Sequence, residues 1–216
     1  MTEILAKTWL ELGTPTLSDA LDRLGVASQC QGIRMQGGSG CAGPAFTVRY
    51  LPVGVSGGTV GDYVDDVPPN AVIVLDNNGR TDVSVWGGLL SLAAIQKHIA
   101  GTIIDGVHRD TKEMQALGYS LFSRGAFMRT GKDRVAVVAI NEDVQLSGIR
   151  VANNDLVIAD DDGVVVIPQH SIEKVLEVAQ TIKVAETKIS DALRNGQRLD
   201  QARNQVGYFN LQRHEK

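Results

Sequence analysis

The adjacent residues Arg109 and Asp110, near the middle of the chain, are of types that could bind a charged ligand. They follow the apolar stretch 101–105, which has the composition of a buried strand. The guanidinium of Arg109 is planar and permanently charged, so it suits a carboxylate or an oxyanion that grows during a reaction. The carboxylate of Asp110 is a hard oxygen ligand of the kind that Mg²⁺ or Mn²⁺ prefers. The pair therefore indicates a site for an anion and a divalent metal.

A second candidate site precedes this pair at Gly87, Gly88, Leu89 and Leu90, where a loop enters a predicted helix. The first N–H groups of a helix have no partner within it, and the helix dipole is positive at that end. Such a helix start could hold a carboxylate or a phosphate. Two glycines before a helix also form purely structural turns, so the motif alone leaves both interpretations open.

A structural interpretation also exists for the charged residues. Asp110 and Glu113 have the Asp-x-x-Glu spacing of a capping box, and Arg109 would then be an ordinary surface charge. His108 has a pKa near neutrality and could serve as an acid or base. Because successive strand residues point to opposite sides, we expect His108 to be structural or to face solvent. Spacing alone does not decide between these interpretations.

The elements that must position these residues follow an α/β pattern. Helical spacing of apolar residues predicts helices at 14–25, 84–98 and 111–117, with Thr16 and Asp19 as a capping box for the first. Apolar runs and alternating patterns predict strands at 44–50, 71–75, 101–105, 135–140, 156–159 and 164–167, the last two joined by a hairpin at Asp162-Gly163. The strand 101–105 thus ends just before Arg109, and open α/β sheets bind ligands at the carboxyl ends of their strands.

The last third of the chain has a different pattern. A long C-terminal helix is predicted at about 171–193 from an apolar stripe, and a polar tail follows from about residue 200. Glu186 falls within the apolar stripe, between Ile182 and Ile189. A carboxylate in that place is costly unless it has a partner. The alternative is a partly exposed glutamate at the edge of an interface.

Composition excludes several classes of protein. The chain has 216 residues, 43% of them hydrophobic, which is enough for a buried core. The net charge of −4 arises from interspersed acids and bases, so we expect neither nucleic acid nor a membrane as a partner. No signal peptide is recognised, and we expect a cytoplasmic protein in which Cys30 and Cys41 are reduced, structural thiols.

Several sequence blocks, in order, resemble the RraA-like family, which comprises the regulators of ribonuclease activity A and the class II 4-hydroxy-4-methyl-2-oxoglutarate aldolases. The blocks are Thr14-Pro-Thr-Leu-Ser-Asp-Ala-Leu, Gly43-Pro-Ala-Phe-Thr-Val, Trp86-Gly-Gly-Leu-Leu followed by Ala93-Ala94, Gly101-Thr-Ile-Ile-Asp-Gly-Val-His-Arg-Asp110, and Asp160-Asp-Asp-Gly-Val-Val-Val-Ile-Pro168. Together they extend over most of the chain. Blocks in a shared order are far more specific than any single motif.

The resemblance implies one RraA-like domain over residues 1–216, a swivelling β/β/α fold, and a ring-shaped trimer, alone or paired into a hexamer, with active sites between protomers. By the same resemblance, Arg109 binds substrate, Asp110 ligates the metal, and the amides of Leu89 and Leu90 hold a pyruvyl carboxylate. Glu186 matches a glutamate of the last helix that reaches the site of a neighbouring protomer in related aldolases.

One position departs from the well-studied aldolases. Where they carry an aspartate that would help to hold metal-bound water, this chain has Gly88. Glu113 lies one helical turn beyond Asp110, on the same face, and could replace that carboxylate. The substitution weakens the expectation of aldolase activity more than it weakens the expectation of a metal site.

The expected function is that of a lyase dependent on a divalent metal, Mg²⁺ in preference to Mn²⁺, which cleaves a carbon–carbon bond in short 2-oxo acids through a pyruvate enolate. The candidate reactions are cleavage by a 4-hydroxy-4-methyl-2-oxoglutarate aldolase and decarboxylation by an oxaloacetate decarboxylase. The residues expected to take part in catalysis are Arg109, Asp110, Glu113 and Glu186, and Asp110 and Glu113 are the expected metal ligands. The alternative is a non-enzymatic regulator that binds and inhibits a ribonuclease.

Overall fold

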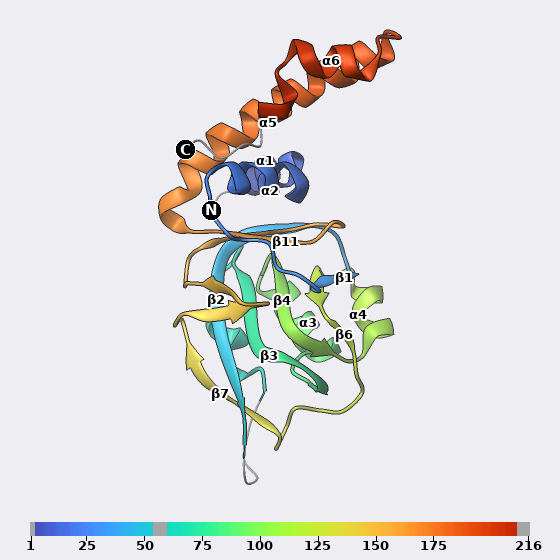
Figure 1. Ribbon diagram of the computed structural model, residues 1–216. Coiled ribbons are helices and arrows are strands. Elements are labelled where there is room, and N and C mark those ends of the chain that lie inside the picture. Colours follow the sequence, from blue (N-terminus) through green and yellow to red (C-terminus); the bar gives the residue numbers. More distant parts are fainter. Residues whose placement is uncertain (1–2, 54–59, 211–216) are drawn as a thin grey trace.

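A curled mixed β-sheet forms the centre of the computed structural model, which describes residues 3–53 and 60–210 (Figure 1). Within these residues the sheet has nine strands, in the order β1-β5-β4-β3-β2-β10-β11, with β6 paired to β4 and β7 paired to β2. Its strands are β1 (Arg34–Gly37), β2 (Cys41–Pro52), β3 (Val72–Ser84), β4 (Gly101–His108), β5 (Leu121–Ser123), β6 (Gly125–Ala126), β7 (Val135–Ile140), β10 (Leu156–Ala159) and β11 (Val164–Ile167). The predicted α/β class is confirmed.

Parallel pairing in the middle of the sheet determines where its carboxyl edge lies. β2, β3 and β4 run parallel, with Asp76 of β3 opposite Asp105 of β4. The outer strands β1, β7, β10 and β11 pair antiparallel. Beyond Asp76, β3 continues through two irregularities to Ser84, which is paired near Val107. The ends of β3 and β4 therefore leave the sheet side by side.

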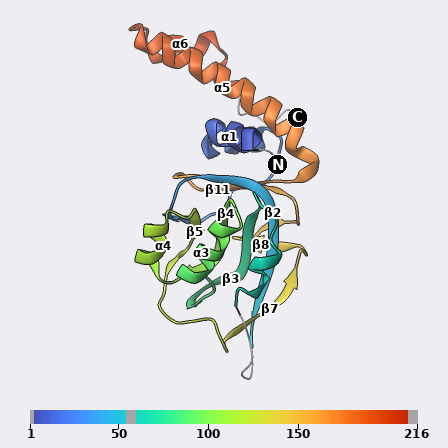
Figure 2. The same ribbon diagram turned by 180° about the vertical axis from the view of Figure 1, so that it is seen from behind.

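Two faces of the sheet carry separate cores, as the two-residue period of strands requires. On one face, Ile73, Leu75 and Ile104 pack with α3 (Gly88–Gln96), α4 (Thr111–Leu117) and the short helix η1 (Asp62–Asp66) (Figure 2). On the other face, Val72 and Val74 pack with β10, β11 and the small hairpin of β8 (Val144–Leu146) and β9 (Ile149–Val151). Helices α3 and α4 thus lie on the same face, where their first residues can approach one another.

A third core joins the N-terminal and C-terminal helices to β10 and β11. It contains Trp9 of α1 (Glu3–Leu12), Leu17 and Leu21 of α2 (Thr14–Arg23), and apolar residues of α5 (Ile172–Arg194). In both ribbon views, α5 runs away from the sheet and is followed by α6 (Leu199–Gln205) and the short η3 (Tyr208–Asn210). The segment from about residue 200, predicted as a polar tail, therefore includes a short helix. Another short helix, η2 (Gln169–Ser171), precedes α5.

Many element boundaries agree with the sequence patterns. The strands at 135–140, 156–159 and 164–167, the hairpin between the last two, and the helix at 111–117 are all confirmed. Gly118 ends that helix with φ 67°, the left-handed conformation that glycine adopts without a steric penalty. Local signals were sufficient wherever an apolar run ended at a clear turn residue.

One predicted helix start and one predicted capping box are wrong, whereas the predicted start of the first helix at Thr14 is confirmed. The helix expected from Ser84 begins at Gly88, because Ser84 is still part of β3 and binds the 129–130 segment. The capping box of Thr16 and Asp19 is also absent, since α2 begins at Thr14. The amide and the hydroxyl of Thr14 donate to the Asp160 carboxylate at 2.7 and 2.5 Å, so a residue distant in sequence caps the helix.

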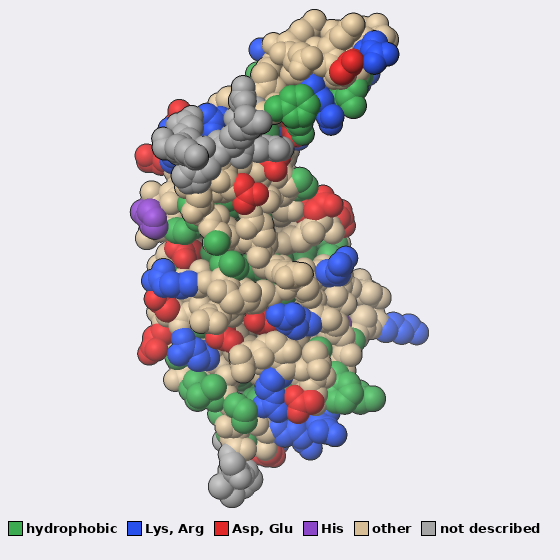
Figure 3. Space-filling model, in the orientation of Figure 1, with side chains coloured by type: hydrophobic (Ala, Val, Ile, Leu, Met, Phe, Trp, Pro, Cys, Tyr) green, Lys and Arg blue, Asp and Glu red, His purple; other side chains and the backbone are tan. Residues whose placement is uncertain are grey.

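Positive and negative side chains are mixed over the visible surface (Figure 3). Glutamate and aspartate side chains lie beside lysines and arginines, and several form exposed ion pairs, such as Arg150 with Asp143. Among the described helices, none is both long and apolar enough to cross a membrane.

Candidate functional site

A small pocket lies where the end of β4 meets the start of α3. Its cavity volume is about 180 Å³. Arg109 and Asp110, which follow β4, form one side of it, and the turn Trp86-Gly87 before α3 forms another. The lining residues are Val60, Ser84, Val85, Trp86, Gly87, Leu89, Leu90, Arg109, Asp110 and Thr130. The structure therefore brings together the two motifs that the sequence singled out.

Asp110 turns its carboxylate toward α3 instead of capping its own helix. Its φ of 59° is left-handed, and its side chain makes no capping hydrogen bond to α4. Oδ2 accepts a hydrogen bond from the Gly88 amide at 3.2 Å and lies 3.6 Å from Arg109 Nε. The capping-box interpretation of Asp110 and Glu113 is therefore wrong. Since about 40% of each side chain of the Arg109–Asp110 pair stays exposed, both retain capacity for a ligand.

The start of α3 is held in place by a buried hydrogen-bond chain. Trp86 Nε1 donates to Ser91 Oγ at 2.9 Å, and Ser91 Oγ donates to the Gly87 carbonyl at 3.1 Å. The Ser91 amide donates to the same carbonyl, so the amides of Leu89 and Leu90 precede the first intrahelical bond. These two amides lie at the positive end of α3, next to Arg109.

Glu113 occupies the space in which a side chain at position 88 would begin. An ideal Cβ on Gly88 would stand 2.5 Å from the Glu113 Cδ, closer than real contacts allow. An ideal Cβ on Gly87 would stand equally close, 2.5 Å, to Asp110 Oδ2. The two glycines therefore allow two carboxylates to approach the start of α3. An aspartate at position 88 would require the exposed Glu113 side chain to move.

The fit of a metal to this site can be judged from its donors. Within the described part of the chain, no three His, Cys, Asp or Glu side chains lie together as a complete metal site. Asp110 and Glu113 nevertheless both face the Gly87-Gly88 turn. Mg²⁺ is commonly held by one or two carboxylates, with waters and substrate oxygens completing the shell. The two carboxylates fit such an ion, provided that the substrate supplies further oxygens.

Glu186 is not brought to this pocket within one protomer. It lies half-buried on α5, which packs mainly against α2, α6, η2 and α1. Helices α3 and α4, by contrast, lie against the sheet (Figure 2). A role for Glu186 in the site of a neighbouring protomer therefore remains a prediction.

His108 is structural, which confirms one of the two alternatives expected for it. The side chain is fully buried, with Nδ1 2.9 Å from Ser123 Oγ and Nε2 3.0 Å from Thr111 Oγ1. Burial lowers its pKa from the usual value of 6.5, so the neutral ring is favoured. Cys30 and Cys41 are also buried and free, and burial raises the pKa of each to about 12. This supports the expectation that they are structural thiols.

Four residues that line the pocket were not predicted from the sequence: Val60, Ser84, Val85 and Thr130. Ser84 donates through its amide and its hydroxyl to the Arg129 carbonyl, at 2.8 and 2.9 Å. This contact places Thr130 at the pocket. No local pattern marks residues 60 or 130, because their position depends on pairing between distant segments.

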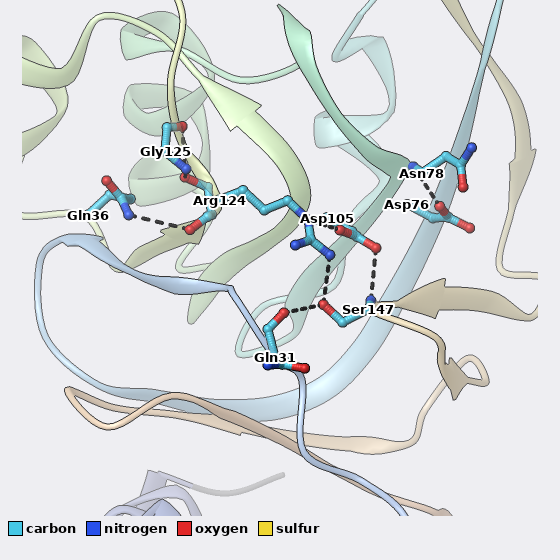
Figure 4. Close-up of polar contacts among 9 residues, drawn as sticks. Gln31, Gln36, Asp76, Asn78, Asp105, Arg124, Gly125 and Ser147 are labelled. Carbon is cyan, nitrogen blue, oxygen red and sulfur yellow. Dashed lines mark hydrogen bonds and ion pairs between the residues drawn. The ribbon is translucent and has the colours of Figure 1, made fainter.

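A second Asp–Arg pair lies on the other face of β4 (Figure 4). Arg124 Nε donates to Asp105 Oδ1 at 2.5 Å, and the Ser147 amide donates to Asp105 Oδ2 at 2.8 Å. Arg124 Nη2 donates to Ser147 Oγ at 2.8 Å, and that hydroxyl donates to the Gln31 carbonyl at 2.5 Å. The network ties β4 to the turn between β8 and β9 and to the segment before β1.

Comparisons with known proteins identify the family. The model of the RraA-like family, described as Aldolase/RraA, matches residues 14–166. Protein DlpA of Legionella pneumophila is 34% identical over 208 residues, which are 94% of this chain and 34% of that protein. This chain therefore spans about a third of the length of that relative.

Two further proteins represent the two activities associated with the family. A 4-hydroxy-4-methyl-2-oxoglutarate aldolase of Thermus thermophilus is 27% identical over 129 residues, which are 58% of this chain and 76% of that protein. The solved structure of Streptomyces coelicolor RraAS2, described as an unusual member of the RNase ES inhibitor RraA protein family, has a TM-score of 0.79 and 25% identity. That similarity covers 86% of this chain and 96% of RraAS2.

Proposed function

The chain belongs to the RraA-like family, and on that premise we propose that it is a carbon–carbon lyase that cleaves short 2-oxo acids with the help of a divalent metal. The single observation that carries the proposal is the convergence of Arg109, Asp110 and the start of α3 on one small pocket. This arrangement places a cation, a carboxylate and backbone amides around one small pocket, which supports the proposal. We propose Mg²⁺ as the metal and Asp110 and Glu113 as its protein ligands.

Binding of the substrate would use the start of α3 and Arg109. The amides of Leu89 and Leu90 suit the carboxylate of a 2-oxo acid, since backbone N–H groups at a helix start attract anions. Arg109 would lie against the C2 oxygen, on which negative charge develops as the bond between C3 and C4 breaks. A bound divalent metal would supply Lewis acidity at that oxygen.

Two reactions share this enolate. In decarboxylation of oxaloacetate, carbon dioxide leaves with C4, and the electron pair of the broken bond forms the pyruvate enolate. In retro-aldol cleavage, a base must also remove the proton of the 4-hydroxyl group. Glycine at position 88 removes one carboxylate found in the well-studied aldolases, so we propose that decarboxylation is at least as prominent as aldol cleavage.

We further propose that the protein assembles as a ring-shaped trimer in which Glu186 of one protomer approaches the pocket of the next. The half-buried place of Glu186 on α5, away from its own pocket, is consistent with such a role. Light scattering coupled to size-exclusion chromatography would measure the mass of the assembly. Glu186→Gln should lower turnover without changing that mass. A monomer with full activity would contradict this assembly.

The proposed activity is tested by release of pyruvate. Purified protein with Mg²⁺ is incubated with oxaloacetate or 4-hydroxy-4-methyl-2-oxoglutarate, and pyruvate is followed with lactate dehydrogenase. Metal-dependent turnover above the uncatalysed rate is expected. Asp110→Ala should reduce kcat/KM by about 10²-fold or more, as loss of an essential electrostatic group does. Rates in the presence of Mg²⁺ that equal the uncatalysed background with both substrates would contradict the enzyme proposal.

Glu113 provides a separate test of the metal site. Glu113→Ala should weaken activation by Mg²⁺, raising the metal concentration needed for half-maximal activity, while Lys112→Ala on the same helix should not. If Glu113→Ala needs no more Mg²⁺ than the wild type, Glu113 does not replace the carboxylate missing at position 88.

A second candidate function is inhibition of a ribonuclease, which the likeness to RraAS2 favours. It predicts that the protein slows RNA cleavage by a ribonuclease of the same host without needing the pocket. Inhibition that survives Arg109→Ala, together with absence of lyase turnover, would favour this function.

A further inference from the structure

A short turn joins β4 to α4, and it contains Arg109 and Asp110. Asp110 has a φ of 59° in this turn, a left-handed conformation that residues with a side chain adopt less readily than glycine. Aspartate tolerates this conformation better than most residues, yet it persists only where neighbouring contacts hold it. The direction of the Asp110 carboxylate therefore depends on what holds the turn.

Backbone hydrogen bonds hold each end of the turn separately. On the β4 side, the Arg109 amide donates to the Trp86 carbonyl at 3.0 Å. On the α4 side, the Asp110 carbonyl accepts from the Met114 amide, also at 3.0 Å. Neither bond spans the turn, so a contact that does span it would add to the constraint on Asp110.

One side-chain hydrogen bond spans the turn. His108 Nε2 lies 3.0 Å from Thr111 Oγ1, so a bond between positions i and i+3 encloses Arg109 and Asp110. His108 is the last residue of β4 and is fully buried, and Thr111 is the first residue of α4. The bond thus fastens the start of α4 to the end of a core strand. The two residues that it encloses are those that we propose to bind the substrate and the metal.

The other partner of His108 determines the direction of this bond. Ser123 Oγ donates to the Gly125 carbonyl and accepts from the Gly125 amide, both at 3.1 Å. Because its one proton is used, Ser123 Oγ accepts from His108 Nδ1, which lies 2.9 Å away. In the neutral ring, Nε2 then has no proton and accepts from the Thr111 hydroxyl. Thr111 is therefore the donor at the end of a chain of hydrogen bonds that begins at Gly125.

We propose that Thr111 is a positioning residue of the metal site, and that its bond to His108 holds the Asp110 carboxylate toward the pocket. The inference rests on the proposed lyase function. Thr111 does not line the pocket, so it acts on the placement of Asp110 and not on the ligand itself. Without this bond the turn can relax toward conformations that aspartate prefers, and the carboxylate then turns away from the Gly88 amide.

Binding of Mn²⁺ tests the proposal without turnover. Thr111→Val removes the hydroxyl at nearly constant volume, whereas Thr111→Ser retains it. The electron paramagnetic resonance signal of free Mn²⁺, titrated with each protein in the presence of pyruvate, gives the Kd of the metal. The Kd of Thr111→Val should rise by about tenfold or more, as is usual when a group that orients a metal ligand is lost, and Thr111→Ser should bind Mn²⁺ as the wild type does.

The outcomes separate this inference from the proposed function. A Kd of Thr111→Val equal to that of the wild type would overturn the inference and leave the lyase proposal standing. Absence of Mn²⁺ binding by the wild type would overturn the metal site, and the inference with it.

A matched variant distinguishes positioning from a general loss of stability. Thr181 Oγ1 donates to the Glu177 carbonyl at 3.0 Å on α5, so Thr181→Val also removes one side-chain hydrogen bond of a helix. Thr181→Val should leave the Kd of Mn²⁺ unchanged, and circular dichroism should show both valine variants folded at the assay temperature. An equal rise of the Kd in Thr181→Val would contradict the role assigned to Thr111.

Turnover of oxaloacetate gives a second readout. Thr111→Val should lower kcat by about tenfold, because the displaced Asp110 and Arg109 no longer face the oxygen on which charge develops. KM should change little, since the substrate carboxylate is proposed to bind at the start of α3, a separate helix. Thr111→Ser should restore kcat. A rise in KM with unchanged kcat would show that Thr111 serves substrate binding instead, and the inference would fail.

Discussion

Two Asp–Arg pairs lie along or just after β4, and they differ in what they leave available. Asp105 and Arg124 are tightly bonded, with side chains only 6% and 27% exposed, and both Asp105 oxygens accept hydrogen bonds (Figure 4). Arg109 and Asp110 lie 3.6 Å apart, and each side chain is about 40% exposed. The first pair is saturated by the protein, whereas the second keeps donors and acceptors for a ligand.

The difference shows that residue type does not by itself identify a functional site. Both pairs offer the same chemical groups, and the aspartate of each lies in the carboxyl half of β4 or just after that strand. Asp105 faces the core beneath the β8–β9 turn, while Asp110 follows the strand and adopts a left-handed conformation that aims its carboxylate at α3. Asp105 and His108 therefore form hydrogen bonds within the protein, whereas Arg109 and Asp110, which follow them, remain partly exposed.

The largest expected effect is on stability, at the saturated pair. Arg124→Ala leaves Asp105 buried without its cation, which should lower the free energy of unfolding by about 3–5 kcal/mol. Arg150→Ala is the control, because it breaks an exposed ion pair and should cost about 0–1 kcal/mol. Urea denaturation followed by circular dichroism measures both. Equal losses of unfolding free energy in the two variants would show that the buried pair contributes no more to stability than an exposed pair.

The next largest effect is on catalysis, at the open pair. Arg109→Ala should lower kcat/KM by about 10²–10³-fold, because it removes the cation that faces the developing oxyanion. The melting temperature should stay close to that of the wild type, since the Arg109 side chain is half-exposed and loosely paired. A fall in stability comparable with that of Arg124→Ala would show that Arg109 is also structural.

A smaller effect is expected at the hydrogen bonds that hold the start of α3. Ser91→Ala leaves Trp86 Nε1 without its acceptor and removes one of the two hydrogen bonds that the Gly87 carbonyl accepts from Ser91, a change that should cost about 1–3 kcal/mol of stability. Because the amides of Leu89 and Leu90 are then held less firmly, the Kd for pyruvate should rise by about tenfold, equivalent to about 1.4 kcal/mol. Ser190→Ala, at an exposed position on α5, should change neither quantity. Unchanged pyruvate binding in Ser91→Ala would show that the amides at the start of α3 do not bind the anion.

The smallest expected effect is a pH dependence of stability from His108. Since burial lowers the pKa of His108 in the folded protein, the unfolded chain binds the proton more readily. The stabilising contribution is therefore complete above the unfolded pKa of about 6.5 and is lost as pH falls below it. His108→Gln should flatten the decrease in stability below pH 6.5, whereas exposed His170→Gln should not. If the free energy of unfolding of His108→Gln falls with pH as steeply as that of the wild type, other groups cause the acid sensitivity.

Much of the site could be predicted from the sequence, although local spacing also allowed a purely structural interpretation. Arg109, Asp110 and Gly87 were predicted to contact a ligand, and they do line one pocket, whereas Gly88 lies beside it and donates its amide to Asp110. The capping box was an equally local interpretation, and only the orientation of the Asp110 side chain excludes it. Sequence spacing determines that two residues are close, not which neighbour their side chains face.

Elements whose signals are local could be predicted from the sequence alone. The period of apolar residues and the terminating Gly118 located the helix 111–117, and short apolar runs located the strands 135–140, 156–159 and 164–167. These signals depend on residues within a few positions of one another, so no knowledge of the remaining chain is needed. The ordered blocks likewise identified the family.

Which polar groups remain exposed and available to a ligand depends on contacts between separate elements, and the sequence does not reveal these contacts. The capping of α2 by Asp160, the placement of Thr130 at the pocket and the closeness of Glu113 to Gly88 all join separate elements. The same holds for Asp105, whose partners Arg124 and Ser147 are supplied by other segments of the chain. Such contacts depend on how the sheet pairs and curls, and the free energy of each group depends on the partners that this pairing supplies.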